Sequence, residues 1–196
     1  MTPPIEAPVE CTGLILAGGK SRRFGSNKAN YLLNGKPMIE WVYASLAHIC
    51  PQILIATTAD SHPYNVPAKH IVDVYDDAGP LAGLHAGIQA AQTPWVIAVP
   101  VDMPYLKPSL LVALTTKCTD KVDAIICRDK FGLQPFPACY HTRLETALAF
   151  QLEAQRYTFK QFLDSIELVV HDLPAQQLIN INTPNDLSTP DAAKQI

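Results

Sequence analysis

The sequence lacks several features that mark large classes of protein. In its 196 residues no apolar run approaches the roughly 18 residues that cross a bilayer. Residues 1–10 carry neither the basic nor the apolar region of a secretory signal. No Cys-x-x-Cys pair occurs and the five cysteines are an odd number, which argues against a disulfide framework or a zinc site. We therefore expect a cytoplasmic protein with reduced thiols and no membrane segment, in which residues 1–10 form a disordered leader.

Acidic residues are absent from one long stretch near the N-terminus. The net charge of −3 argues against a general nucleic-acid-binding protein. Between Cys11 and Ile39, however, there is no acid at all. The cations in this stretch are Lys20, Arg22, Arg23, Lys28 and Lys36. This local excess suits a polyanionic small ligand, and the alternative is a solvated basic surface.

Short apolar runs alternate with helical patterns over the first two thirds of the chain. Strands are expected at Thr12–Leu16, Gln52–Thr57, His70–Val74, Trp95–Val101 and Val122–Cys127. Helices are expected at Met38–Ile49, Leu81–Ala91 and Ser109–Lys117, the last with Ser109 as its N-cap. Because the strands are apolar throughout, the pattern predicts an α/β fold of three layers, with a mostly parallel sheet covered by helices on both faces.

The pattern loosens after Phe131. Gln134–Tyr140 contains two prolines, so we expect an edge strand or an irregular one. Helices at Thr142–Leu152 and Phe159–Ile166 and strands at Leu168–Asp172 and Ile179–Asn182 are expected to follow, and then a helix that begins at Thr183–Pro184. No repeat or linker interrupts the chain, so we expect a single domain over residues 1–196.

A glycine-rich loop follows the first expected strand. Residues 16–28 read LAGGKSRRFGSNK, and the stretch Gly19-Lys20-Ser21 has the form of the end of an ATPase P-loop. The first glycine of a P-loop would stand at position 14, but that residue is Leu14, inside the apolar run. The loop must therefore contact a ligand in a different way.

The composition of this loop still suits a nucleotide. Gly18 and Gly19 allow the backbone to approach a base or a sugar closely, and successive loop amides can surround phosphates. Arg22 or Arg23, together with Lys28, can neutralise a triphosphate.

Two further acidic sites follow expected strands. Asp102 comes directly after Trp95–Val101, at the edge of the sheet where ligands bind in such folds. A carboxylate there can hold Mg²⁺, and the alternative is a cap for the next turn. Asp73 ends the third strand, with Asp76 and Asp77 as competitors for the same role.

These motifs together resemble the molybdenum cofactor guanylyltransferase (MobA) family. Residues 16–28 resemble the signature loop of nucleotidyltransferases with a Rossmann-like GT-A fold. The stretches 79–83 (GPLAG), 99–104 (VPVDMP) and 180–187 (NINTPNDL) resemble three more motifs of the family, in the family's order.

The resemblance implies a reaction, a metal and a set of residues. GMP would pass from GTP to the terminal phosphate of molybdopterin with Mg²⁺, and the partners would be enzymes that make or insert the cofactor. The implied catalytic residues are Lys28, Asp102 and Arg22, with Asp102 as the metal ligand. The implied nucleotide- and cofactor-binding residues are Leu16, Ala17, Gly18, Gly19, Lys28, Asp73, Gly79, Asn180 and Asn182. Because the attacking phosphate is already anionic, the reaction requires no general base. We therefore expect the six histidines to be structural or to lie on the surface.

Several alternatives remain open at this point. Departures such as Phe24, Asn27 and Ala56 weaken the assignment of guanine as the base. A cytidylyltransferase for the same acceptor, a sugar-phosphate nucleotidylyltransferase and a non-catalytic nucleotide-binding cofactor-delivery protein are the other candidates. The 79–83 stretch would equally suit a closely packed helix start, and Asn180 and Asn182 would equally suit a turn that caps the last helix.

Overall fold

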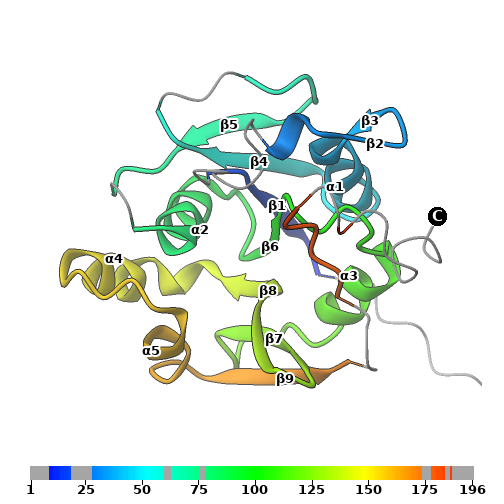
Figure 1. The fold of residues 1–196 in the computed structure, drawn as a ribbon. Coiled ribbons are helices and arrows are strands. Elements are labelled where there is room, and N and C mark those ends of the chain that lie inside the picture. Colours follow the sequence, from blue (N-terminus) through cyan, green and yellow to red (C-terminus); the bar gives the residue numbers. More distant parts are fainter. Residues whose placement is uncertain are drawn as a thin grey trace, which may run out of the picture.

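The protein is built on one large sheet. The computed structural model describes residues 9–18, 28–59, 63–75, 78–173, 178–183 and 186. These form a seven-stranded sheet in the order β5-β4-β1-β6-β8-β7-β9 (Figure 1). β8 runs antiparallel to both of its neighbours, and all other neighbouring strands are parallel. The predicted fold class is therefore confirmed.

The strands begin and end within two residues of the predicted positions. They are β1 (Cys11–Leu16), β4 (Gln52–Thr57), β5 (Lys69–Val72), β6 (Trp95–Pro100), β7 (Ala124–Asp129), β8 (Gly132–His141) and β9 (Leu168–Asp172). Continuous apolar runs form most of them because both faces of the sheet are covered, so side chains on either face need to be hydrophobic.

Helices cover both faces of this sheet (Figure 1). They are α1 (Met38–Ala47), α2 (Pro80–Ala90), α3 (Pro108–Thr115), α4 (Glu145–Glu153) and α5 (Phe159–Leu163), with the 3₁₀ turns η1 (Lys28–Asn30) and η2 (Thr142–Leu144). The core is divided accordingly, since successive strand residues face opposite sides. Ile15 belongs to the cluster of α1 and α3, whereas Leu14 belongs to the cluster of α2, α4 and α5.

Of the two alternatives expected for Gln134–Tyr140, an edge strand or an irregular strand, the structure shows the irregular one. β8 lies inside the sheet, between β6 and β7. Its pairing with β7 is interrupted after Gln134 and resumes at Ala138, which is also where its pairing with β6 ends. Pro135 and Pro137 fall in this gap, so their missing N–H groups cost the sheet no hydrogen bond. The irregularity was predicted, but the interior position was not.

Two local predictions are wrong. Helix α3 begins at Pro108 with Lys107 as its N-cap, so Ser109 lies inside the first turn. Proline suits that position because its φ is already helical and its missing N–H would have no helical partner. Ile179–Asn182 forms no strand, although Ile181 is buried and its two neighbours are exposed, as the alternation predicted. Residues 184 and 185 lie outside the described residues, so the helix predicted from Thr183–Pro184 is not tested.

A short hairpin precedes α1. β2 (Leu32–Leu33) and β3 (Lys36–Pro37) pair antiparallel around a turn in which Asn34 and Gly35 both have positive φ, 51° and 77°. Asn-Gly favours this turn, and the sequence signal for it was missed. In the described part of the chain, no helix has the length and apolar character needed to cross a membrane. All five cysteines are free and buried.

Candidate functional site

The strand order creates a crevice at the C-terminal edge of the sheet. From β1 the chain runs outward through β4 to β5 and then returns to place β6 on the other side of β1. The backbone contacts continue beyond the strands, with Ala17 N donating to Ala56 O (3.0 Å) and Val101 N donating to Leu16 O (3.1 Å). Ligands bind at this kind of switch point because the connections leave in opposite directions.

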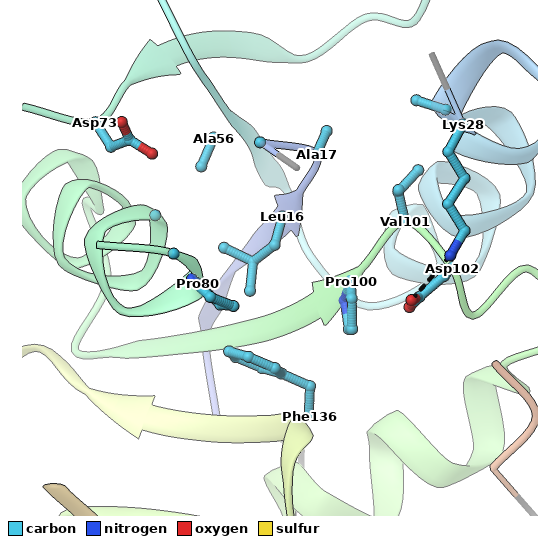
Figure 2. Close-up of a pocket in the computed structure, with 14 residues that line it drawn as sticks. Leu16, Ala17, Lys28, Ala56, Asp73, Pro80, Pro100, Val101, Asp102 and Phe136 are labelled. Carbon is cyan, nitrogen blue, oxygen red and sulfur yellow. Dashed lines mark hydrogen bonds and ion pairs between the residues drawn. The ribbon is translucent and has the colours of Figure 1, made fainter. Parts of the chain in front are cut away.

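A pocket of about 270 Å³ opens at this edge (Figure 2). It is lined by Leu16, Ala17, Gly18, Lys28, Ala29, Ala56, Asp73, Gly79, Pro80, Gly83, Pro100, Val101, Asp102 and Phe136. The site residues proposed from the sequence that line it are Leu16, Ala17, Gly18, Lys28, Asp73, Gly79 and Asp102. The structure thus brings together residues from five separate stretches of the chain, and their roles stay predictions.

An ion pair lies at one end of the pocket. Lys28 Nζ donates to Asp102 Oδ2 at 3.1 Å and to Asn182 Oδ1 at 3.2 Å (Figure 2 shows the first contact). The side chains of Lys28 and Asp102 are 13% and 22% exposed, so the pair is shielded from water but open to a ligand. Lys28 comes from η1, and Asp102 comes from the turn after β6.

The second oxygen of Asp102 is available for a cation. Oδ1 is buried and has no hydrogen-bond partner within the described residues. An anionic oxygen in that state needs a positive or donating group, which a divalent cation would supply. The same residues contain no cluster of three or more His, Cys, Asp or Glu side chains. Asp102 therefore fits a metal whose other ligands come from a phosphate-bearing substrate and water.

The opposite end of the pocket combines an acid with backbone groups. A Cβ on Gly18 would lie 3.7 Å from Asp73 Oδ2, so these two residues are neighbours. Asp73 N donates to Thr57 O at 3.3 Å, which fixes the chain as it leaves β5. Gly79, at the N-terminus of α2, has a φ of 65° with open space around it. Its conformation, rather than crowding, requires glycine there.

Close packing explains part of the glycine motif at the start of α2. A Cβ on Gly83 would lie only 2.9 Å from Leu16 Cδ2, and one on Gly87 would lie 2.3 Å from Leu14 Cδ2. These glycines let α2 approach β1 closely. The closely packed helix start considered as an alternative therefore holds for Gly83 but not for Gly79, and both glycines line the pocket.

The C-terminal segment, residues 178–183, lies against the ion pair. Ile181 is fully buried beside Leu33 and Met38, and its N–H donates to Asp102 O at 2.8 Å. This anchor brings Asn182 to Lys28. Asn180 is exposed and does not line the pocket.

Some residues of the pocket were not singled out from the sequence. Phe136 was not singled out from the sequence, and in Figure 2 its ring lies below Leu16, Pro80 and Pro100. Its only sequence signal is an aromatic residue between two prolines. Gly19 and Arg22 lie outside the described residues, as do Arg23, Asp76 and Asp77, so the predictions for them are not tested.

Comparisons with known proteins agree on one family. The family model for a MobA-like NTP transferase domain matches residues 13–169. A probable molybdenum cofactor guanylyltransferase of Geobacillus sp. (strain WCH70) is 33% identical over 186 residues, covering 89% of this chain and 94% of the relative. A molybdenum cofactor guanylyltransferase of Yersinia pseudotuberculosis (serotype O:1b, strain IP 31758) is 35% identical over 180 residues, covering 89% and 92%. The solved molybdopterin-guanine dinucleotide biosynthesis protein A of Archaeoglobus fulgidus superposes with a TM-score of 0.78 at 25% identity, covering 90% and 95%.

Proposed function

Because the chain belongs to the MobA-like NTP transferase family, we propose that it transfers GMP from GTP to the terminal phosphate of molybdopterin. The products are a molybdopterin guanine dinucleotide and pyrophosphate. The names of the relatives and of the Archaeoglobus structure support this reaction.

The Lys28–Asp102 pair at the end of the pocket carries the proposal. Both side chains stand at the C-terminal edge of the sheet, where the triphosphate of a nucleotide in the pocket would lie. Lys28 donates hydrogen bonds to phosphate oxygens and neutralises their charge. The attacking phosphate is anionic at neutral pH and needs no general base, so the protein accelerates the reaction by positioning the two phosphates and reducing their repulsion.

Nucleotidyltransferases of this family typically use a divalent metal. We propose Mg²⁺, with Asp102 as its protein ligand, because the second oxygen of Asp102 is buried and lacks a partner among the described residues. When bound, the metal neutralises charge on the triphosphate and makes pyrophosphate a better leaving group.

The acid at the other end of the pocket favours guanine. Guanine carries two adjacent donors, N1–H and the 2-amino group, which a carboxylate accepts well. Asp73 lines the pocket beside Gly18 and provides such an acceptor. The backbone of residues 16–18 and the apolar surface of Pro80 and Phe136 contact the rest of the nucleoside. Cofactor-biosynthesis and target enzymes as partners, and the cytoplasmic location, stay predictions.

Nucleotide selectivity tests this function first. Thermal shifts with GTP, CTP, ATP and UTP, each with and without Mg²⁺, should show selective stabilisation by GTP. Pyrophosphate release with GTP and molybdopterin should follow. Selective stabilisation by CTP would instead assign the cytidylyl reaction.

Asp102→Asn tests the carboxylate. It keeps the side chain's size but removes its charge, so we expect Mg²⁺-dependent turnover to fall by about a hundredfold or more. The matched control is Asp164→Asn, an exposed aspartate after α5 and away from the pocket. Turnover unchanged by Asp102→Asn would contradict an enzymatic role and favour a nucleotide-binding delivery protein.

A further inference from the structure

The end of the C-terminal segment is held by the carboxylate of Asp186, a few residues further along the chain. Asp186 Oδ2 accepts the N–H of Asn182 at 2.6 Å and the N–H of Thr183 at 2.8 Å. The hydrogen bond from Asn182, opposed by burial and joined by those from Thr183 and the charge of Lys28, holds the pKa of Asp186 below its usual value. The turn at 182–183 is therefore fixed by an ionised side chain.

Contacts on either side of this turn determine where Asn182 lies. On one side the Ile181 N–H donates to the carbonyl of Asp102 at 2.8 Å, which fastens the segment to the turn after β6. On the other side Asp186 holds the next two N–H groups. Between these anchors the Asn182 side chain reaches Lys28 Nζ at 3.2 Å.

Lys28 also determines the orientation of this amide. An ammonium has only donors, so the amide must turn its oxygen toward Lys28. The two N–H groups of the same amide then lie on the opposite side and are suited to an anionic oxygen. The ammonium and the amide together can contact two neighbouring phosphates.

We propose that Asp186 is a positioning residue for the acceptor phosphate, and that it acts by holding Asn182 against Lys28. This inference rests on the proposed function, in which an acceptor phosphate must approach the nucleotide at Lys28. Asp186 touches neither substrate. The negative charge of Asp186 is taken up by the N–H groups of Asn182 and Thr183. The acceptor phosphate, which is also anionic, instead meets the neutral amide donors of the Asn182 side chain.

Hydrogen exchange tests the positioning without any activity. In Asp186→Ala the amide hydrogens of Asn182 and Thr183 should exchange at least about tenfold faster than in the wild type, because both lose their acceptor. The Ile181 amide, held by Asp102 O, is the internal control and should change less than twofold. Equal acceleration at all three positions would mean that the whole segment detaches, and it would overturn the inference. Asp186→Asn, which keeps one acceptor oxygen, carries the test if the alanine variant does not fold.

A double-mutant cycle tests the consequence for the reaction. Asp186→Ala should raise KM for molybdopterin by about tenfold while KM for GTP changes less than about twofold. In an Asn182→Ala background the same substitution should add less than twofold, because the side chain through which Asp186 acts is gone. Asp164→Ala, with melting temperatures for all variants, controls for the loss of an aspartate.

The outcomes separate this inference from the proposed function. If the wild type does not transfer GMP, the proposed function fails, and hydrogen exchange still decides whether Asp186 positions Asn182. If the wild type is active but Asp186→Ala resembles Asp164→Ala, or its effect persists in the Asn182→Ala background, the inference fails alone.

Discussion

At the scale of residues, Lys28 connects distant parts of the chain. Its Nζ contacts Asp102, 74 positions away, and Asn182, 154 positions away. Such a side chain is restrained before a ligand arrives, so the proposed binding of a phosphate would cost it less conformational entropy. The resting partners of Lys28 are also the groups proposed to bind the metal and the acceptor.

Removal of this lysine should weaken nucleotide binding. We expect Lys28→Ala to cost about 1.5–3 kcal/mol of GTP binding, the range for a hydrogen bond to a charged group. Isothermal titration calorimetry with GTP and Mg²⁺ measures it. Lys36→Ala is the control, because Lys36 lies over the Trp41 ring at 4.8 Å and outside the pocket. An unchanged dissociation constant for Lys28→Ala would refute the role proposed for that residue.

At the scale of elements, the start of α2 combines a conformational need with a steric one. The chain turns into the helix at Gly79, where φ is positive, and Gly83 and Gly87 let the helix lie close to β1. The helix N-terminus is thereby held at the pocket wall, where Gly79 and Pro80 lie. Backbone conformation and packing distance together shape this wall of the pocket.

Alanine substitutions at two glycines with positive φ distinguish an effect on stability from an effect on GTP binding. Gly79→Ala should destabilise the protein by about 1–3 kcal/mol, because alanine is strained at a φ of 65°. Gly35→Ala, at a φ of 77° in the hairpin turn, should destabilise it through the same kind of strain. Urea unfolding measures both. Only Gly79→Ala should also weaken GTP binding, and equal GTP affinity in the two variants would exclude a contribution of the α2 start to the site.

At the scale of the whole molecule, three histidines with lowered pKa values predict a response to acid. His85 on α2 is 3% exposed, and neither ring nitrogen has a partner within the described residues. Burial lowers the pKa of His85, and the charges of Glu145 and Glu153 only partly oppose this. Burial also lowers the pKa values of His141 and His171. As expected from the sequence, none of the three lines the pocket.

Stability should therefore fall in mild acid. Below about pH 6.5 these histidines take up protons in the unfolded chain before they do so in the folded one, so the free energy of unfolding decreases as pH falls from 7 toward 5. Urea unfolding at pH 7.5 and 5.5 measures this. His85→Phe, which keeps a ring against Tyr75, should lose less stability than the wild type over that interval. His48→Gln, on the exposed end of α1, is the control. An equal loss in His85→Phe and the wild type would contradict the prediction.

The amino-acid sequence by itself determined the alternation of strands and helices and the residues that end the strands. Leu16 and Asp102 were predicted to meet at one edge because the C-terminal ends of parallel strands lie together, and they line one pocket. The periodicity of apolar residues and the residue preferences of turns are local properties. For this reason the bounds of most strands were predicted to within two residues, and the Asn34–Gly35 turn could also have been predicted.

Only the tertiary structure decided which strands pair and which distant side chains meet. The prolines of β8 suggested an edge strand or an irregular one. They fit inside the sheet because the pairing with β7 is interrupted there and the pairing with β6 ends at Ala138, and Phe136 between them reaches the pocket. The contacts of Asn182 with Lys28 and Asp186 likewise depend on the burial of Ile181 beside Leu33 and Met38. Such contacts join residues that are far apart in the sequence. Which residues meet is decided by competition among all possible packing arrangements during folding, and a local sequence pattern does not contain that information.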